Sequence, residues 1–370
     1  MTADLTEEQR ELADMLRTLL AQRSDSTAIR QAVESTPGYD AGLWALLCGE
    51  IGIASLAIPE EAGGAGFTVV ESEVALEELG YALTPSPYLG SVAIAAQAIL
   101  TAADVDDGAR LLPDIASGES IAALAWASAD GRWDPAAIDV QAIADGDDWT
   151  LSGRVPFVLE GESADIILAI ARTADGPRLF EVTDTARTTR EATPAMDITL
   201  RLATLDFDST PARALGSGDP EHLQAVYAHA LASTAAVQAG TTARGLDMTV
   251  DYARNRVQFG RQIGSFQAVK HRLADMHVQT EIAKTTARAA AGALTENAPD
   301  RAELAALAAV TCSTALEHIA AETIQLHGGI AITWEHDAHL IFKRAHALGQ
   351  LFGTAREHRA AAEEQVLAAR

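Results

Sequence analysis

Arg256-Val257-Gln258-Phe259-Gly260-Arg261-Gln262-Ile263-Gly264-Ser265-Phe266-Gln267 is the stretch of sequence that decides the fold. It interrupts a long helical pattern with two glycines, and it brings the cations Arg254, Arg256 and Arg261 close together along the chain. A second segment, 325–329, ends a later apolar helical run with a glycine pair. Because glycine has no Cβ, the backbone at such a pair can approach a ligand closely. A polyanionic ligand requires fixed donors and a positive field, and the cluster at 254–261 is the best basic patch that the sequence offers for one.

The composition favours a helical protein with more than one domain. A chain of 370 residues exceeds one compact core. It is 48% hydrophobic, with abundant alanine and few aromatic residues, which is typical of packed helices. The formal charge of −25 argues against nucleic acid and anionic membranes as partners.

The sequence also predicts the compartment. No apolar run reaches the length of a membrane span, and no cationic leader precedes an apolar segment at the N-terminus, so we expect no membrane insertion. Cys48 and Cys312 lie far apart without a CxxC spacing. We therefore expect free thiols in a reducing cytoplasm and no metal site.

The order of periodic patterns predicts an α+β fold that is mostly α, in three domains. Residues 1–118 read as helices, and Thr6 with Gln9 forms a capping-box pair at the first of them. Residues 119–214 hold short runs separated by Asp-Gly turns, the pattern of antiparallel strands and hairpins. Residues 215–370 return to long alanine-rich helices, which predicts a C-terminal four-helix bundle.

Motifs in this order carry a family resemblance along nearly the whole chain. They are Leu56-Ala57-Ile58-Pro59-Glu60-Glu61 with Gly63, Gly64 and Gly66; Trp149-Thr150-Leu151-Ser152-Gly153; Arg256-x-Gln258-Phe259-Gly260; Phe266-Gln267-Ala268-Val269; Gln325-x-His327-Gly328-Gly329; and Trp334-Glu335-His336. The chain resembles the acyl-CoA dehydrogenases, which hold FAD at a subunit interface. The resemblance implies the same three-part fold, an acyl-CoA substrate and an electron-transferring flavoprotein as electron acceptor.

The resemblance also assigns residues to the cofactor. It implies that Arg256 reaches the FAD pyrophosphate of a neighbouring subunit, with Phe259 packed beside it and Gln267 assisting. It further implies that backbone approaches the same FAD at Gln325, Gly328 and Gly329. These six residues are the predicted cofactor-binding set.

The catalytic base of the family is missing at both positions where relatives keep it. That base is a carboxylate, which takes the Cα proton while hydride goes to the flavin. The later position falls in Leu351-Phe352-Gly353-Thr354, where Phe352 cannot accept a proton. The earlier position falls on Ala230. Its neighbour His229 is a weak candidate, because a lone helix histidine is more often structural than catalytic.

The middle segment departs from the family as well. Relatives carry a hydroxyl residue that hydrogen-bonds the flavin ring, where this chain has Leu159. Residues 125–133 replace another segment that lies near flavin and acyl-CoA in relatives. The losses therefore fall on residues facing the subunit's own flavin ring, while those reaching a neighbour's FAD remain.

Three interpretations follow. In the first, the chain is an accessory subunit of a heterotetrameric acyl-CoA dehydrogenase of the actinobacterial kind, acting on bulky thioesters such as sterol side chains or on fatty acyl groups. In the second, it is a self-sufficient homodimeric or homotetrameric enzyme with a displaced base, such as Asp247, His229 or another carboxylate that the motif alignment does not place. In the third, it is a non-enzymatic scaffold or CoA-thioester binder.

Overall fold

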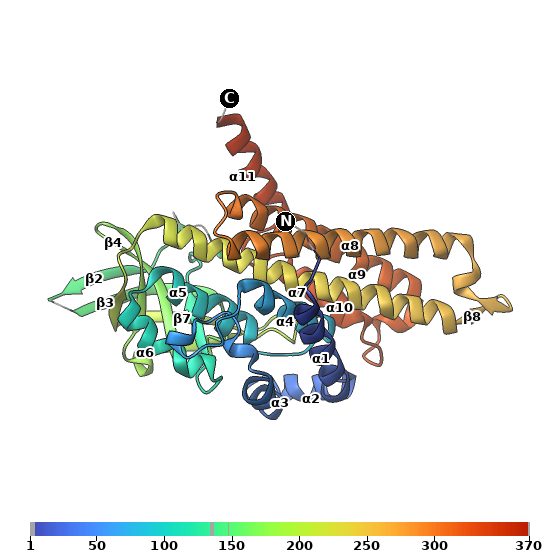
Figure 1. Ribbon diagram of the computed structural model, residues 1–370, viewed down its shortest axis with the longest axis horizontal. Helices are drawn as coiled ribbons and strands as arrows, with labels where there is room; N and C mark the ends of the chain where they lie inside the picture. Colours follow the sequence, from blue (N-terminus) through green and yellow to red (C-terminus); the bar gives the residue numbers. More distant parts are fainter. Residues whose placement is uncertain (1–3, 134–136, 147, 369–370) are drawn as a thin grey trace. The chain divides into compact units, whose positions relative to one another are not determined.

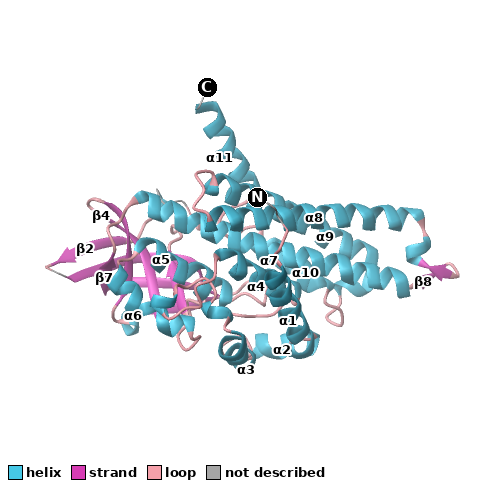
Figure 2. Cartoon of the chain, viewed as in Figure 1, coloured by secondary structure: helices cyan, strands magenta, loops and turns pink. Residues whose placement is uncertain are grey.

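The computed structural model describes residues 4–133, 137–146 and 148–368 (Figure 1). The chain divides into two compact units, each assembled from separate stretches. Unit 1 comprises residues 1–31, 73–84 and 231–370, and unit 2 comprises residues 32–72 and 85–230. Figure 2 shows helices in cyan and strands in magenta; apart from one short hairpin in the C-terminal stretch, the strands belong to the middle stretch.

The N-terminal third is helical, as the sequence predicts. Helix α1 (Glu7–Arg23) begins with the predicted capping box, since the Thr6 hydroxyl accepts from the Gln9 N–H and the Gln9 side chain accepts from the Thr6 N–H. The other elements here are α2 (Ser26–Glu34), α3 (Ala41–Leu46), η1 (Leu47–Ile51), η2 (Ile53–Ser55), η3 (Glu60–Ala62), α4 (Val69–Tyr81), η4 (Tyr88–Ala96), α5 (Gln97–Ala102) and α6 (Val105–Ala116).

Unit 2 contains one seven-stranded sheet. Its strands are β1 (Ala122–Ala125), β2 (Gln141–Asp145), β3 (Asp148–Leu159), β4 (Ile166–Thr173), β5 (Gly176–Val182), β6 (Thr188–Thr193) and β7 (Leu202–Leu215), with η6 (Thr185–Arg187) before β6. The pairings β4–β2, β2–β3, β3–β7, β7–β5 and β5–β4 form a closed circuit. Strand β1 adds to β4, and β6 adds to β7.

The sheet is mixed, which corrects the prediction of a purely antiparallel domain. Strands β1 and β2 both pair with β4 in parallel, and the remaining pairs are antiparallel. The reason is the connection between β1 and β4. It contains the β2–β3 hairpin and is therefore long enough for the crossover that a parallel pair requires.

The helices of the C-terminal stretch pack through small and apolar side chains. They are α7 (Pro220–Asn255), α8 (Gln267–Thr295), α9 (Arg301–His327), α10 (Ala338–Leu348) and α11 (Ala355–Ala368), with the short elements β8 (Val257–Gln258), β9 (Arg261–Gln262), η7 (Ile263–Ser265) and η8 (Gly328–Ile332). Leu246 of α7, Met276 of α8 and Ile319 of α9 form one buried cluster. The fold class, α+β and mostly α, is confirmed, while the three-domain boundaries at 118/119 and 214/215 stay a prediction.

Helices α4 and α7 cross at very short backbone distance in unit 1. A Cβ placed on Gly240 would lie 1.9 Å from the carbonyl oxygen of Glu77, and one on Gly80 would lie 2.4 Å from that of Val237. The Thr241 hydroxyl donates to the Gly80 carbonyl at 3.1 Å across the same crossing. Only glycine fits at these two positions, because any side chain would overlap the opposing backbone.

The crossing buries three carboxyl groups of α4 in different ways. Glu78 forms an ion pair with Arg17 at 2.7 Å, and Glu77 pairs with Arg288 at 3.1 Å and Lys284 at 3.6 Å. Glu73 has no ion pair among the described residues, and its carboxylate accepts one hydrogen bond from the Ser233 hydroxyl at 2.9 Å. Burial raises the pKa of Glu73 to about 8, so the group is neutral at pH 7.

By length and composition, the helical stretch Arg301–Ile332 could cross a bilayer, with a mean hydropathy of 1.5 over its most apolar window. This stretch comprises α9 and the short element η8 that follows it. A single such helix is weak evidence of a membrane span, because core helices pass the same test. Here Cys312, Ala315, Leu316 and Ile319 of α9 are fully buried.

Replacing Glu73 with glutamine tests this interpretation of its charge. The pKa of Glu73 is near 4.5 in the unfolded chain and about 8 in the folded chain. Between these two pH values the unfolded chain loses the proton more readily than the folded chain, which favours unfolding. Wild-type stability therefore falls from pH 4.5 to 8, while Glu73→Gln mimics the neutral acid at every pH. We expect the variant to gain stability relative to wild type between pH 5 and pH 8.5, by on the order of 4 kcal/mol.

Urea unfolding at the two pH values measures the difference. The matched control is Glu77→Gln, which loses the Arg288 and Lys284 pairs and should destabilise at both pH values. A Glu73→Gln effect that is the same at pH 5 and pH 8.5 would mean that Glu73 is ionised in the fold.

Candidate functional site

Residues 257–262 form a β-hairpin between the long helices α7 and α8. Strands β8 and β9 pair Val257 with Gln262 and Gln258 with Arg261. The turn consists of Phe259 and Gly260, with φ of +52° and +75°. Positive φ at both central residues is the geometry of a type I′ turn, which suits the twist of a hairpin. Phenylalanine is an uncommon choice for the first of these positions.

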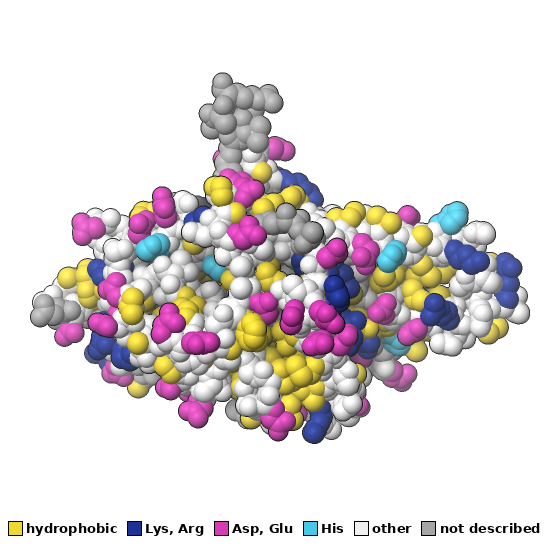
Figure 3. Space-filling view, viewed as in Figure 1, with side chains coloured by type: hydrophobic (Ala, Val, Ile, Leu, Met, Phe, Trp, Pro, Cys, Tyr) yellow, Lys and Arg dark blue, Asp and Glu magenta, His cyan; other side chains and the backbone are white. Residues whose placement is uncertain are grey.

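The hairpin presents an exposed aromatic ring beside unpaired cations. The Phe259 side chain is 92% exposed, and its ring meets Phe266 edge-on at 6.2 Å. Arg261 lies over the Phe266 ring at 4.0 Å. Arg254, Arg256 and Arg261 are exposed and have no ion pair within the described part of the chain. Figure 3 shows basic side chains gathered at the end where Figure 1 labels β8.

The second segment ends helix α9 in an open glycine turn. Gly328 has φ +65° and ψ −145°, a conformation that is essentially reserved for glycine. A Cβ added at Gly328 or Gly329 would meet no atom within 4 Å, so the space in front of both residues is open. Gln325 is exposed one turn earlier, and Gln267 is exposed as the first residue of α8.

An aromatic stack joins these two segments inside unit 1. The rings of Tyr252 and His327 lie 4.3 Å apart at 28°, and His336 packs on His327 at 4.6 Å. The Nδ1 of His327 hydrogen-bonds the Thr323 carbonyl at 2.7 Å, and because a carbonyl only accepts, Nδ1 carries the proton. Burial lowers the pKa of His327, so the ring is neutral near pH 7.

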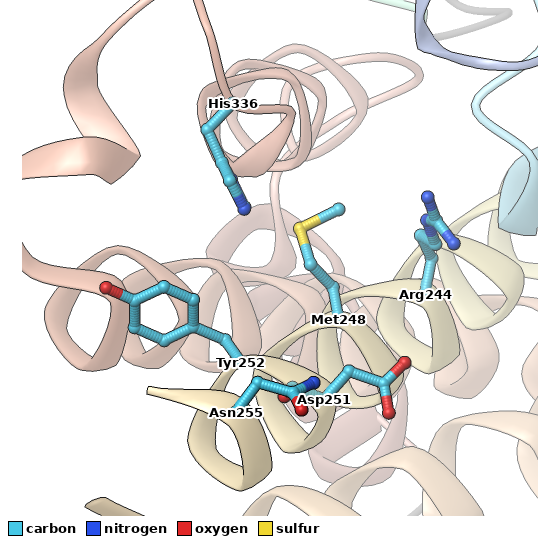
Figure 4. A pocket seen from close by; sticks show the side chains of 6 residues that line it. All are labelled: Arg244, Met248, Asp251, Tyr252, Asn255 and His336. Atoms are coloured by element: carbon cyan, nitrogen blue, oxygen red, sulfur yellow. The ribbon is translucent and has the colours of Figure 1, made fainter. Parts of the chain in front are cut away.

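A pocket of about 320 Å³ lies against the same tyrosine. Its walls come from α7 and the turn before α10, and Figure 4 shows the side chains of Arg244, Met248, Asp251, Tyr252, Asn255 and His336 around it. The Nδ1 of His336 accepts from the Ala338 N–H at 3.2 Å. The Tyr252 hydroxyl points away from Met248 in Figure 4. One flank of the Tyr252 ring therefore borders an open pocket.

The two positions predicted to lack the base are apolar and closed. Ala230 is fully buried, and Phe352 is 2% exposed in a left-handed conformation with φ +61°. His229 is half-buried beside Ala230. Asp247, the other candidate, accepts a hydrogen bond from the Tyr81 hydroxyl at 2.9 Å on an exposed face.

The segments predicted to depart from the flavin-ring contacts are filled by aromatic packing in unit 2. Trp126 meets Tyr227 edge-on at 5.7 Å, and Trp133 packs on Phe157 at 6.0 Å. A Cβ on Gly131 would touch the Phe157 ring at 2.8 Å. Leu159 ends strand β3 and is 6% exposed.

Two buried carboxyl groups were not singled out by the sequence reasoning. They are Glu73 and Glu160, and burial raises the pKa of each to about 8. Glu160 follows strand β3 with φ +58°, and no described group hydrogen-bonds its buried Oε2. The sequence carries no signal that separates Glu73 from its neighbours, since Glu71, Glu77 and Glu78 lie close to it along the chain.

Comparisons with known proteins agree with this arrangement. The profile for the acyl-CoA dehydrogenase N-terminal domain matches residues 6–119, and the profile for the C-terminal domain matches residues 224–367. Acyl-CoA dehydrogenase IpdE2 of Mycobacterium tuberculosis is 40% identical over 356 residues, covering 95% of each chain. IpdE2 of Mycolicibacterium smegmatis is 38% identical over 362 residues, covering 98% of this chain and all of the relative.

Solved structures give the same result. A variant of the Tcur3481–Tcur3483 steroid ACAD superimposes with a TM-score of 0.90 at 30% identity, over 98% of both chains. A chain of the ChsE4–ChsE5 complex from Mycobacterium tuberculosis also gives 0.90, at 28% identity and 99% coverage of both. The chain belongs to the acyl-CoA dehydrogenase family, whose cofactor is FAD.

Proposed function

We propose that this chain is the accessory subunit of a heteromeric acyl-CoA dehydrogenase. It would lend Arg256, Phe259, Gln267, Gln325, Gly328 and Gly329 to an FAD whose flavin ring and catalytic base belong to a homologous partner. The observation that carries the proposal is the contrast between two regions. The cationic hairpin is open and unpaired, while both base positions, Ala230 and Phe352, are apolar and buried.

The residues at the hairpin fit the pyrophosphate of FAD. Arg256 and Arg261 are exposed donors without a carboxylate partner among the residues described. The amide of Gln267 lies at the positive N-terminal end of α8, which favours an anion. The open space before Gly328 and Gly329 lets the cofactor touch backbone, which a Cβ would prevent.

The chain's own contribution to the reaction is therefore binding and orientation. When bound, FAD supplies the hydride acceptor for α,β-dehydrogenation of a CoA thioester. Arg256 would neutralise pyrophosphate charge, and the Phe259 ring would exclude water beside it. The described residues at 229–231 and 351–353 include no carboxylate, so the Cα proton would pass to a group of the partner.

The relatives point to the partner and the substrate class. Two similar structures bear names of protein pairs, ChsE4–ChsE5 and Tcur3481–Tcur3483, and the second is called a steroid ACAD. We accordingly propose a heterotetramer in the cytoplasm that acts on a bulky CoA thioester, with an electron-transferring flavoprotein as the electron acceptor.

Arg256→Ala is expected to weaken FAD retention in the complex. The substitution removes a charge-assisted contact that is worth roughly 1.5–3 kcal/mol, which corresponds to an increase in Kd of about tenfold or more. Flavin absorbance per complex after dialysis measures it. Arg213→Ala, which removes an exposed arginine on β7 in unit 2, is the matched control. If the FAD occupancy of the complex is unchanged in Arg256→Ala, the assignment of Arg256 to the partner's FAD is wrong.

Phe352→Glu alone is expected to give no dehydrogenase activity in the isolated chain. The change places a carboxyl at one base position, but Leu159 still offers no hydrogen bond to a flavin ring, and Trp133 and Phe157 still fill their segment. Turnover of acyl-CoA with an artificial electron acceptor is the measurement. Phe352→Leu serves as the folding control, and turnover by Phe352→Glu would contradict the proposed loss of the flavin-ring site.

A self-sufficient enzyme with a displaced base is the second candidate, and one observation favours it. The carboxyl of Glu73 has a pKa of about 8 and accepts a hydrogen bond from the Ser233 hydroxyl. Ser233 lies about one helical turn after Ala230 on α7. A base poised near neutral pH requires such a pKa. If the lone chain proves active, Glu73→Gln should abolish the activity. A non-enzymatic scaffold is the third candidate, and it predicts no FAD in any complex.

The deciding experiment compares the visible spectrum of the lone chain with that of its complex with a homologous acyl-CoA dehydrogenase subunit. The accessory-subunit proposal predicts a colourless lone chain and a yellow complex with one FAD per pair of chains. Stoichiometric FAD on the lone chain, bleached by an acyl-CoA, would instead establish a complete active site.

A further inference from the structure

The predicted FAD contacts come from two segments far apart in sequence. Arg256 follows the end of α7, and Gly328 and Gly329 follow the end of α9. A ligand that bridges both segments binds well only if their spacing is fixed beforehand, since ordering them on binding would reduce affinity. The spacing must therefore be set by contacts between the ends of α7 and α9.

The Tyr252–His327 stack is one of these contacts, beside the hydrogen bond of the Thr249 hydroxyl to Thr323 at 3.1 Å. Tyr252 lies one turn before Arg256, and its carbonyl accepts the Arg256 N–H at 2.8 Å. His327 is the last residue of α9 and immediately precedes Gly328, the C-cap residue. The two rings are 4.3 Å apart, with an interplanar angle of 28°. The stack therefore joins the residues that lie just before Arg256 and just before Gly328. Stacked aromatic rings stabilise each other beyond the area that they bury.

The His327 ring is held in one orientation. Its Nδ1 donates to the Thr323 carbonyl at 2.7 Å, and Thr323 in turn contacts the Thr249 hydroxyl of α7 at 3.1 Å. His336 packs on the ring at 4.6 Å. The ring is 3% exposed, and its Nε2 has no partner within the described ranges. Its packing and its Nδ1 bond, not a polar contact at Nε2, fix the ring.

The Tyr252 ring is held by the same stack and by an edge-on contact with His336 at 6.3 Å. One flank borders the 320 Å³ pocket, which leaves it without packing there (Figure 4). Its hydroxyl has no hydrogen bond to any described residue. The aromatic ring, and not the phenol oxygen, is therefore the part of Tyr252 that matters.

We propose that Tyr252 and His327 form a positioning pair that fixes the spacing between Arg256 and the Gly328–Gly329 turn, and so preorganises the FAD pyrophosphate contacts. The inference rests on the proposed function for its ligand, and on the geometry of unit 1 alone for the positioning itself.

The test compares removal of each ring with its retention. In the complex, Tyr252→Leu and His327→Leu are expected to raise the Kd for FAD about tenfold, as measured by flavin fluorescence on titrating the apo complex. Tyr252→Phe keeps the ring, and we expect its Kd to stay within twofold of wild type. His327→Phe keeps the stack while losing the Nδ1 bond, and it should recover most of the affinity lost in His327→Leu.

A second readout does not depend on FAD. In the full-length lone chain, hydrogen exchange of amides 256–262 and 328–332 should be faster in both leucine variants and near wild type in Tyr252→Phe. The double variant Tyr252→Leu with His327→Leu should be no worse than the poorer single variant, because both remove one contact. His358→Leu, which alters a buried histidine of α11, controls for general destabilisation.

The two levels of the proposal fail separately. If Arg256→Ala weakens FAD binding while the leucine variants bind FAD and exchange like wild type, the positioning pair is overturned and the FAD assignment stands. In the opposite case, the leucine variants lose protection from hydrogen exchange at 256–262 and 328–332, but they and Arg256→Ala bind FAD normally. That result would mean that the pair sets the spacing, but that the two segments do not bind FAD.

Discussion

Helix α7 is placed by its crossing with α4, where Gly80 and Gly240 allow backbone to meet backbone. The carbonyls of Glu77 and Val237 occupy the space that a Cβ would need. Because interiors are packed as densely as crystals, no neighbouring group can move to make room. The crossing fixes the axial position of α7 in unit 1, and with it the height at which Tyr252 meets His327 and the hairpin leaves the helix. The positions of Tyr252 and of the hairpin in unit 1 therefore depend on this crossing.

The exposed cations of the hairpin belong to unit 1, and the aromatic packing of residues 126–157 belongs to unit 2. Its exposed cations at the hairpin have no carboxylate among the described residues to neutralise them, although acidic residues outnumber basic ones by 52 to 27. In unit 2, the segments that face a flavin ring in relatives are occupied by Trp126, Trp133 and Phe157. Exposed, unpaired cations in unit 1 and closed aromatic packing in unit 2 are the two observations on which the proposed accessory role rests.

Local signals in the sequence predicted the parts of the fold that depend on local physics. The Thr6–Gln9 capping box and the long C-terminal helices are confirmed, because caps and helical periodicity act within a few residues. The parallel pairing of β1 with β4 was missed, because alternation along a strand does not specify its neighbour. The glycines of 256–267 were recognised as a break, but the hairpin was not, since its strands are two residues long and its turn begins with phenylalanine. Neither the burial of Glu73 nor the Tyr252–His327 stack could be read from the sequence, because both depend on which helix faces meet.

The exposed turn at Phe259 has a consequence for how the chain behaves in isolation. A bulky residue at φ +52° costs about 1–3 kcal/mol, and leaving a phenyl ring 92% in water forgoes the benefit of burying it. Nothing in the hairpin itself offsets this deficit. A surface that fits the ring only as the folded hairpin presents it would raise the stability of the chain by mass action. The melting temperature would then rise with the concentration of that surface, and the lone chain would be the least stable form of the protein.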